Sequence, residues 1–474
     1  MSRVDGLVDG LVDVLRASIG AAQVLTDADM SHYELDWRQR YRGRALAVVR
    51  PGTTAEVAAI VQACAAHGAS LVPQGGNTGL VGASVPDGSG SQVLLSLARL
   101  NRLRSIDDAN LTMTVEAGCV LQSVQEAAAA RGLLFPLSLA AEGSCTVGGN
   151  LATNAGGTGV LRYGNARELC LGLEVVTADG QVWQELSGLR KDNTGYDLRD
   201  LFIGSEGTLG VITAATLKLY PQPAARMTAF AAVASLEAAV ALLQLAQARL
   251  ASSLTGFEVM GEFALGLVRH HFPQLAQPLP AGPWTVLLEQ SDAESAAHAR
   301  ALFEALLETA LERGIITDAA LAQSLEQSRN MWHLRESIPL AQSLEGLNIK
   351  HDISLTVSRI PGFVAQTDAA LARAFPGVRL VNFGHLGDGN LHYNVQAPAG
   401  TAAADFLRNH EAAVNTLVYD AVTAHGGSIS AEHGIGALKR DELARRKSPV
   451  ALKMMRAIKQ ALDPHGRMNP GRLL

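Results

Sequence analysis

Apolar and polar positions follow two spacings along the chain, and each spacing predicts its own kind of element. A helical spacing predicts helices at Val8–Ile19, Val57–His67, Leu236–Leu250, Ala293–Thr309 and Ala404–His425. Short apolar runs predict strands at Leu46–Val49, Ser70–Pro73, Leu173–Thr177, Gln181–Glu185, Ala229–Val233 and Trp284–Glu289. Strands and helices in this succession predict an α+β fold, with an antiparallel sheet in the second half of the chain.

A glycine-rich loop ends the first strand–helix–strand unit. Thr53 and Glu56 fit a capping box before the helix, and Gly68 fits its C-terminal stop. The strand Ser70–Pro73 then runs into Gln74–Ser84, which reads Gln-Gly-Gly-Asn-Thr-Gly-Leu-Val-Gly-Ala-Ser. Backbone N–H groups of such a loop can bind a phosphate group. The chain has neither a Rossmann fingerprint nor a P-loop, so a simple turn is the alternative interpretation.

A second segment, residues 142–157, is also rich in small side chains. It reads Glu-Gly-Ser-Cys-Thr-Val-Gly-Gly-Asn-Leu-Ala-Thr-Asn-Ala-Gly-Gly. Paired glycines and hydroxyl side chains let the backbone lie close to a flat or anionic ligand. This segment therefore strengthens the hypothesis that the first loop binds a phosphate-bearing ligand.

Two histidines flank a glycine-rich turn further along the chain. The segment Asn382–Asn394 reads Asn-Phe-Gly-His-Leu-Gly-Asp-Gly-Asn-Leu-His-Tyr-Asn, which predicts two strands with His385 and His392 at their ends. Across such a turn, both imidazoles can converge on one divalent cation. Glu432 and His433 follow later, and two histidines with one carboxylate leave a metal with the open positions that catalysis requires. Solvated or hydrogen-bonded histidines are the alternative.

Composition narrows the class of protein. The chain has 474 residues, enough for two or three domains, and a formal net charge of −6, which argues against nucleic acid as a partner. Pro221 and Pro223 make a stiff break where we expect a domain boundary. We recognise no secretory signal and no transmembrane segment, so we expect a cytoplasmic protein. The four cysteines, Cys64, Cys119, Cys145 and Cys170, are scattered without C-x-x-C spacing. Their spacing therefore indicates neither a disulfide framework nor a thiolate metal site.

Five segments together resemble a known family. Gly384–His392 and Ser430–Gly436 are similar to the C-terminal signature of FAD-linked 2-hydroxyacid dehydrogenases. Pro73–Gly79, Gly143–Gly157 and Gly204–Ile212 resemble, in the same order, the FAD-binding domain of the vanillyl-alcohol oxidase (PCMH) type. The resemblance spans nearly the whole chain, and it implies both a fold and a cofactor.

The resemblance also implies a division into domains. Residues 1–222 would form the FAD-binding domain. Residues 223–434 would form an antiparallel α+β substrate-binding cap domain that carries the metal site. Residues 435–474 would form a C-terminal helical segment that returns to the FAD.

In that family, the first glycine loop wraps the FAD pyrophosphate and the second segment lies along the flavin and its ribityl chain. A segment near Val211 meets the adenine side, and Asn469 is a candidate contact from the tail. The first loop contains Asn77 and lacks the histidine through which some relatives attach the flavin, so non-covalent FAD is implied. The implied cofactor-binding residues are Pro73, Gly75, Gly76, Asn77, Thr78, Gly79, Leu80, Ser84, Gly143, Ser144, Thr146, Gly149, Asn150, Thr153, Asn154, Gly156, Val211 and Asn469.

The resemblance assigns the histidine segments to catalysis. His385, His392 and Glu432 would hold a divalent metal, which we expect to be zinc, with manganese or cobalt as alternatives. His433 would be the general base, because an imidazole titrates near working pH. The metal would bind the α-hydroxyl and carboxylate oxygens of a small 2-hydroxyacid.

The implied substrate carries two carboxylates. Arg335 and Asn394 would orient the near carboxylate and Lys350 the far one, with His433 at the hydroxyl group. This set implies oxidation of D-2-hydroxyglutarate to 2-oxoglutarate by hydride transfer to flavin N5. Pro339 departs from the dicarboxylate enzymes, which carry a hydroxyl residue there. A D-lactate dehydrogenase or a glycolate oxidase flavin subunit is therefore the alternative, and a metal-dependent hydrolase is a more remote one.

The resemblance leaves the partners open. We expect an electron-transferring flavoprotein or a quinone to reoxidise the flavin, with oxygen as a further alternative. A homodimer is the oligomeric state to test. Neither a nucleic acid nor a membrane-spanning anchor is expected.

Overall fold

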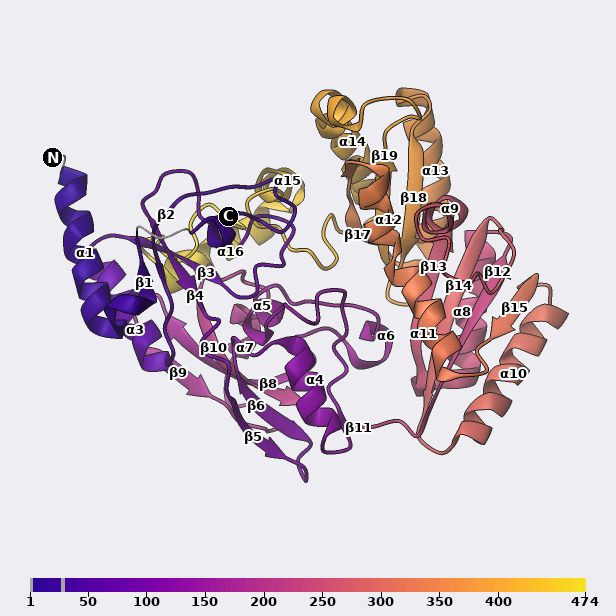
Figure 1. The fold of residues 1–474 in the computed structure, drawn as a ribbon, viewed down its shortest axis with the longest axis horizontal. Helices are drawn as coiled ribbons and strands as arrows, with labels where there is room; N and C mark the ends of the chain where they lie inside the picture. The colour runs from indigo at the N-terminus through magenta and orange to yellow at the C-terminus, as the bar shows by residue number, and fades with distance from the viewer. Residues whose placement is uncertain (1–2, 27–29) are drawn as a thin grey trace. The chain divides into compact units, whose positions relative to one another are not determined.

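The computed structural model describes residues 3–26 and 30–474, and it divides the chain into two compact units (Figure 1). The first unit comprises Met1–Gly156, Gly164–Gln222 and Glu432–Leu474, and the second comprises Gly157–Tyr163 and Pro223–Ala431. The boundary that we expected after residue 222 coincides with a boundary between the units. Two differences are that residues 157–163 group with the second unit and that the chain re-enters the first unit at Glu432. The functions assigned to these parts stay predictions.

The first sheet of the first unit contains the N-terminal strand–helix–strand pattern. Its strands run in the order β1 (Val24–Leu25), β2 (Ala45–Val49), β4 (Gln92–Ser96) and β3 (Ser70–Gln74). The pairs β2–β4 and β3–β4 are parallel. Helix α3 (Thr54–Ala66) returns the chain between β2 and β3, and the connection of residues 75–91 returns it between β3 and β4. The Thr53 hydroxyl accepts a hydrogen bond from the Glu56 N–H at 3.1 Å, so the threonine half of the predicted capping box is confirmed. The Glu56 carboxylate accepts from the Gly52 N–H at 2.6 Å and not from that of Thr53, which differs from the reciprocal bond of the box.

The second sheet of the first unit is antiparallel throughout. Its strands run in the order β5 (Leu103–Asp107), β6 (Thr112–Glu116), β10 (Gly210–Lys218), β8 (Cys170–Thr177) and β9 (Val182–Glu185). The last two are the hairpin that the sequence predicted, with Val176 opposite Val182. A separate short pair joins β7 (Leu133–Leu134) to β11 (Tyr220–Pro221). The helices of this unit besides α3 are α1 (Arg3–Ile19), α2 (Ser31–Glu34), α4 (Leu121–Ala129), α5 (Val147–Ala152), α7 (Arg199–Phe202), α15 (Arg440–Arg446) and α16 (Pro449–Leu462).

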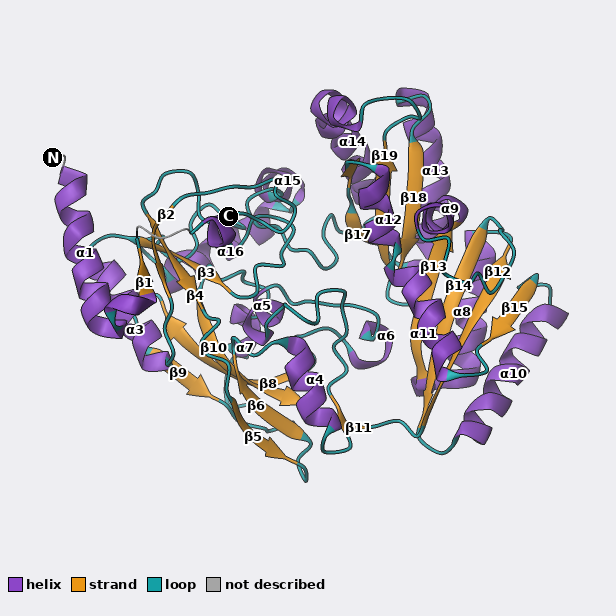
Figure 2. Cartoon of the chain, in the orientation of Figure 1, coloured by secondary structure: helices purple, strands orange, loops and turns teal. Residues whose placement is uncertain are grey.

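The second unit contains one large sheet in which all paired strands are antiparallel (Figure 2). This confirms the antiparallel sheet predicted for the second half of the chain. The strands run in the order β15 (Asp318–Leu321), β12 (Ala225–Val233), β14 (Trp284–Asp292), β13 (Leu254–Gly261), β18 (Arg379–Gly384), β19 (Asn390–Gln396) and β16 (Asn348–Ile349), with β17 (Asp352–Ser354) also paired to β19.

Both faces of this sheet are covered by helices. Along β12, Ala229, Ala231 and Val233 belong to one core and Phe230 to another, as the two-residue period of a strand requires. The first core packs against α8 (Leu236–Leu250), α10 (Ala296–Glu312), α13 (Ile360–Ala374) and α14 (Ala403–Ala424). The second packs against α9 (Glu262–His271), α11 (Leu325–Glu336) and α12 (Ile338–Glu345). Helix α6 (Val160–Tyr163) also belongs to this unit.

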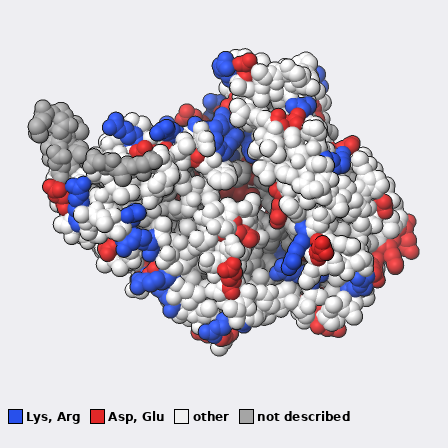
Figure 3. Space-filling model, in the orientation of Figure 1, with Lys and Arg blue, Asp and Glu red and all other residues white. Residues whose placement is uncertain are grey.

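The surface carries both signs of charge. On the face drawn in Figure 3, acidic and basic side chains lie among many neutral ones. The sequence holds 45 acidic and 39 basic residues, which gives the net charge of −6. In the described part of the chain, no helix combines the length and the apolar character that crossing a bilayer needs.

Candidate active site

The loop after β3 packs its glycines directly against the second glycine-rich segment. A Cβ atom on Gly75 would lie 2.4 Å from the Thr146 hydroxyl oxygen, and one on Gly76 would lie 2.0 Å from the Ser144 carbonyl oxygen. A side chain at either position would therefore push the two segments apart. The fold thus brings the two predicted cofactor segments into contact within the first unit.

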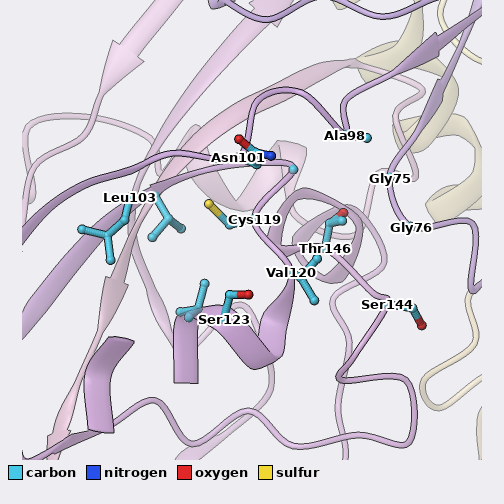
Figure 4. Close-up of a pocket in the computed structure, with 13 residues that line it drawn as sticks. Gly75, Gly76, Ala98, Asn101, Leu103, Cys119, Val120, Ser123, Ser144 and Thr146 are labelled. Carbon is cyan, nitrogen blue, oxygen red and sulfur yellow. The ribbon is translucent and has the colours of Figure 1, made fainter. Parts of the chain in front are cut away.

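These four residues line a cavity of about 330 Å³ (Figure 4). The Thr146 hydroxyl oxygen is buried and has no hydrogen-bond partner among the described residues. Buried polar atoms are nearly always hydrogen-bonded, so this oxygen suits a polar ligand. Glycine backbone beside an unpaired hydroxyl fits the phosphate and ribityl groups of FAD. The remaining lining residues, which the sequence analysis did not assign to the cofactor, are Ala98, Asn101, Leu103, Val115, Gly118, Cys119, Val120, Ser123 and Val124.

Asn77 and Ser84 hold the shape of the first loop with their side chains. The Asn77 side-chain amide donates to the Leu35 carbonyl oxygen at 2.9 Å, and the Ser84 hydroxyl donates to Asn77 Oδ1 at 3.0 Å. Asn77 also has a φ of 53°, a left-handed conformation that asparagine tolerates better than most residues. Contacts of these two residues with FAD stay a prediction, and the backbone is the part of Asn77 best suited to make them.

Side chains of the second segment are also used within the protein. The Thr153 hydroxyl donates to the Gly149 carbonyl oxygen at 3.0 Å, and Asn154 Oδ1 accepts from the Arg167 N–H at 3.0 Å. Asn150, within α5, is buried. These bonds fix the path of the backbone beside the cavity.

The other predicted cofactor residues are spread over the first unit. Pro73 lies in β3 and Val211 in β10, where the Val211 side chain is buried. Thr78, Gly79 and Leu80 continue the first loop, and Gly143 and Gly156 lie at the two ends of the second segment. Their contacts with FAD stay predictions.

The C-terminal tail joins two of the predicted cofactor segments. The Asn469 side-chain amide donates to the carbonyl oxygens of Ala83, at 2.9 Å, and Glu206, at 2.7 Å. Its Oδ1 atom is buried and has no hydrogen-bond partner among the described residues. This oxygen, like the Thr146 hydroxyl, suits a polar ligand, so the predicted cofactor contact of Asn469 is chemically reasonable.

The predicted histidine hairpin is formed by β18 and β19 of the second unit, with Phe383 opposite His392. A ring nitrogen of His385 lies within 4.8 Å of a ring nitrogen of His392, and the ring centroids are 5.7 Å apart. The turn depends on Gly389, which has a φ of 87° and where a Cβ would lie 2.2 Å from the Leu355 carbonyl oxygen. The two imidazoles are therefore close enough to bind one cation.

A buried glutamate connects this hairpin to the predicted substrate arginine. Glu258, in β13, is 0% exposed; its Oε1 lies 2.6 Å from His385 Nδ1, and its Oε2 accepts from Arg335 Nε at 2.8 Å. Burial raises the pKa of Glu258, but the charges of His385 and Arg335 and their hydrogen bonds outweigh it and lower that pKa to about 2. Glu258 is thus an ionised carboxylate that binds both residues.

The second histidine also faces a buried carboxylate. His392 Nδ1 lies 3.9 Å from Asp352 Oδ1, an oxygen that accepts a hydrogen bond from the Asn390 side-chain amide at 2.9 Å. A carboxylate hydrogen-bonded to Nδ1 commonly orients a histidine ligand of a metal. The contact of Glu258 with His385 is short enough to be such a bond, whereas Asp352 only approaches His392 to 3.9 Å. The donor set of the second unit therefore fits a divalent metal.

Glu432 and His433 begin the last segment of the first unit. The residue before them, Ala431, is the last of the second unit, and its N–H donates to Asp352 Oδ2 at 3.2 Å. Glu432 therefore directly follows a residue, Ala431, whose backbone is hydrogen-bonded to Asp352. Joint binding of a metal by His385, His392 and Glu432 stays a prediction, as does the role of His433.

The predicted substrate residues differ in how their side chains are used. The Arg335 guanidinium is buried over the Phe383 ring, 4.9 Å from its centroid. Lys350 is half-buried between β16 and β17. Asn394 accepts from the His351 N–H at 3.1 Å and donates to Gln342 Oε1 at 2.9 Å. Its amide group has two N–H donors, so one of them remains for a substrate oxygen.

Sequence reasoning missed Glu258 and Asp352. Glu258 lies in Leu254–Gly261, a strand whose residues are all buried and which is otherwise apolar or small. An ionisable residue within such a run is rare unless it is paired, and this was the signal that could have identified it. Asp352 directly precedes an apolar run that contains Ile353, and its position gave no comparable signal.

Two described protein families match most of the chain. Residues 45–184 match the family described as "FAD binding domain", and residues 222–473 match "FAD linked oxidases, C-terminal domain". Among solved structures, a substrate-bound p-cresol methylhydroxylase has a TM-score of 0.77 at 17% identity, covering 99% of this chain and 97% of its own. An alkyldihydroxyacetonephosphate synthase has a TM-score of 0.74 at 16% identity, covering 98% and 84%. These likenesses confirm the predicted α+β fold of the vanillyl-alcohol oxidase type.

Two relatives are similar along nearly the full chain. A protein of Xanthomonas citri pv. viticola named D-2-hydroxyglutarate dehydrogenase is 40% identical over 468 residues, which cover 98% of this chain and 97% of that protein. The mitochondrial D-2-hydroxyglutarate dehydrogenase of Bos taurus is 41% identical over 453 residues, which cover 95% and 81%. The chain therefore belongs to the family of FAD linked oxidases and is an FAD-dependent oxidoreductase.

Proposed function

We propose that this oxidoreductase converts D-2-hydroxyglutarate to 2-oxoglutarate with the help of FAD and a divalent metal. The substrate assignment rests on one observation. The chain is 40% and 41% identical, over nearly its whole length, to two relatives named D-2-hydroxyglutarate dehydrogenase. The paired histidines of the second unit, with a buried carboxylate behind each, support the metal. A D-2-hydroxyacid suits both groups, because FAD can accept the hydride from its C2 atom and a metal can bind its hydroxyl and carboxylate oxygens.

FAD, when bound, supplies the hydride acceptor, its N5 atom. Residues of the first unit would hold it without a covalent bond. The N–H groups of Gly75 and Gly76 suit the pyrophosphate, because only glycine allows the backbone to lie so close to Thr146 and Ser144. The buried oxygens of Thr146 and Asn469 suit polar groups of the same cofactor.

We assign the metal to His385, His392 and Glu432. Zinc is our first choice for two imidazoles and one carboxylate, and manganese or cobalt would also accept these donors. When bound, such a cation stabilises the deprotonated form of a hydroxyl group, as zinc lowers the pKa of water from ~15.7 to about 7. The Glu258 carboxylate, which contacts Nδ1 of His385 at 2.6 Å, favours ligation through Nε2 of that histidine.

The remaining residues would bind and deprotonate the acid. His433 accepts the proton of the α-hydroxyl group, because a neutral imidazole is a suitable base near neutral pH. Arg335 orients the near carboxylate through its guanidinium group, and Lys350 binds the far one. Asn394 joins the near-carboxylate contacts by donating its second amide N–H to a substrate oxygen, while the first stays bonded to Gln342.

D-Lactate oxidation is the second candidate, because Pro339 stands where the dicarboxylate enzymes carry a hydroxyl residue. The test compares D-2-hydroxyglutarate with D-lactate and glycolate, using an artificial electron acceptor. We expect Lys350→Ala to lower kcat/KM for D-2-hydroxyglutarate about 10- to 100-fold, the range for losing a charged hydrogen bond, and to change D-lactate turnover little. Exposed Lys453→Ala is the control. Equal effects on the two acids would contradict the substrate assignment.

The proposal extends to the partners of the reaction. An electron-transferring flavoprotein or a quinone would take the electrons from the flavin, in a protein that we expect to be cytoplasmic. Stopped-flow reoxidation of the reduced protein by each acceptor would separate these two. Sedimentation equilibrium would test the expected homodimer.

A further inference from the structure

Glu258 lies in the interior of the large sheet of the second unit. Its strand, β13, has β14 on one side and β18 on the other, and Glu258 pairs with Leu287 of β14. All the residues of β13 are buried. A carboxylate in such a place is costly unless every oxygen has a partner, so its partners reveal what it is for.

One oxygen of Glu258 fixes the state of a histidine. Oε1 lies 2.6 Å from His385 Nδ1, and an ionised carboxylate can only accept hydrogen bonds. The His385 proton that faces Glu258 therefore lies on Nδ1. In the neutral form of the ring, which metal binding requires, the lone pair then lies on Nε2. The ring is held in the tautomer and orientation in which Nε2 can bind a metal.

The other oxygen fixes an arginine. Oε2 accepts from Arg335 Nε at 2.8 Å, and the Phe383 ring lies under the guanidinium carbon at 4.9 Å. Among the described residues, neither Nη1 nor Nη2 of Arg335 takes part in a hydrogen bond that meets ordinary geometry. The guanidinium plane is thus fixed through its inner nitrogen, and its two outer nitrogens suit a carboxylate ligand.

We propose that Glu258 is a positioning residue that holds the metal ligand His385 and the substrate-binding Arg335 in one fixed relation. Each partner uses a different oxygen of the same carboxylate, so a movement of either changes the position of the other. This inference rests on the proposed function, because it assumes that His385 binds a metal and Arg335 a carboxylate. The competing explanation is a buried ion pair that serves stability alone.

The experiment uses the FAD-loaded full chain with Glu258→Gln and Glu258→Asp. A glutamine keeps the shape but can accept from only one of the two partners, because its amide nitrogen is a donor. The matched control is Glu289→Gln, on the neighbouring strand β14. Glu289 accepts from the Trp332 indole at 2.7 Å, and Trp332 lies on α11, the helix that carries Arg335. The readouts are the zinc dissociation constant by chelator competition, KM and kcat at saturating zinc, FAD content and melting temperature.

We expect Glu258→Gln to raise the zinc dissociation constant about 10- to 100-fold, the range for losing an outer partner of a metal ligand. At saturating zinc, KM for D-2-hydroxyglutarate rises by a larger factor than kcat falls, and FAD content stays at the wild-type level. Glu258→Asp, which keeps both acceptors on a shorter side chain, gives smaller shifts in the same direction. Glu289→Gln lowers only the melting temperature.

Other outcomes overturn the inference. Unchanged zinc affinity and KM in Glu258→Gln would leave Glu258 a structural ion pair, and a change in only one of the two would refute the coupling between His385 and Arg335. If Glu258→Gln does not fold, Glu258→Asp decides by the same two readouts. A wild-type protein that binds no zinc, manganese or cobalt contradicts the proposed metal function itself, and that result is obtained before any variant is compared.

Discussion

The backbone N–H of Ile435 donates a hydrogen bond to the Glu206 carboxylate at 2.7 Å. The N–H of Gly436 donates to the second carboxylate oxygen, also at 2.7 Å. Glu206 is buried in the first unit, and its own N–H donates to the Ala152 carbonyl oxygen at 2.8 Å. Because Glu432 and His433 shortly precede Ile435 in the chain, this carboxylate fastens the segment that carries them to the end of α5.

Glu206→Ala should destabilise the first unit. The substitution leaves the buried N–H groups of Ile435 and Gly436 without an acceptor, at about 1–3 kcal/mol for each unsatisfied group. We expect a lower melting temperature and faster loss of FAD on dilution, measured by thermal unfolding and by flavin fluorescence. Exposed Glu126→Ala, on α4, should stay within about 0.5 kcal/mol of wild type. An unchanged melting temperature for Glu206→Ala would show that this junction contributes little.

Gly76→Ala should weaken FAD binding. The new Cβ would lie 2.0 Å from the Ser144 carbonyl oxygen, so the two cofactor segments must separate. Overpacking of this kind costs about 1–3 kcal/mol, and each 1.4 kcal/mol corresponds to a tenfold change in the dissociation constant. Fluorescence titration of FAD-free protein with FAD measures this effect.

Gly88→Ala is the matched control in the connection between β3 and β4, because Gly88 is exposed, is not a predicted cofactor residue, and a Cβ there meets nothing within 4 Å. It should bind FAD like wild type. Equal affinities for Gly76→Ala and Gly88→Ala would mean that close packing of these segments is not needed for the cofactor.

Cys119 gives a chemical test of the cavity. It lines the cavity with Gly75 and Thr146, and burial raises the pKa of its thiol to about 11. Since only the thiolate reacts, FAD-free protein should be alkylated at Cys119 roughly 100-fold more slowly at pH 8 than an unperturbed thiol. The rate should rise about tenfold per pH unit until pH approaches that pKa.

FAD should slow the alkylation of Cys119 further. Peptide mapping after timed iodoacetamide labelling separates it from Cys170, which does not line the cavity and whose pKa burial raises to about 12. FAD should leave the Cys170 rate unchanged. Equal labelling of Cys119 with and without FAD would place the cofactor outside this cavity.

The parts of the fold that depend on short-range pattern were predictable from the sequence. Helix α8 has the same bounds that its spacing predicted, and the histidine hairpin forms as β18 and β19. The Thr53 cap forms as its motif indicated. These features depend on residues that lie close together in the sequence, within one helix or across one hairpin. A short stretch of sequence is therefore enough to predict them.

The parts that depend on the order of strands were not predictable. Glu258 and His385 are 127 residues apart and meet only because β13 and β18 are neighbours in the sheet. Glu206 meets Ile435 across 229 residues because the chain re-enters the first unit at Glu432. The cavity wall formed by Ala98, Asn101 and Cys119 carries no motif, because residues of ordinary connecting segments between strands and helices supply it. The motifs by which the chain resembles a family identify candidate site residues. They do not identify the residues, such as Glu258, that hold those site residues in place.

The most direct test of the metal-assisted reaction is anaerobic reduction of the protein-bound flavin by D-2-hydroxyglutarate, followed by its visible absorbance. The same preparation is measured before and after treatment with a strong chelator, with FAD and metal content determined for each sample. We expect chelation to abolish the bleaching without releasing FAD, and zinc, manganese or cobalt to restore it. Bleaching at the original rate in metal-free protein would refute the proposed role of the metal.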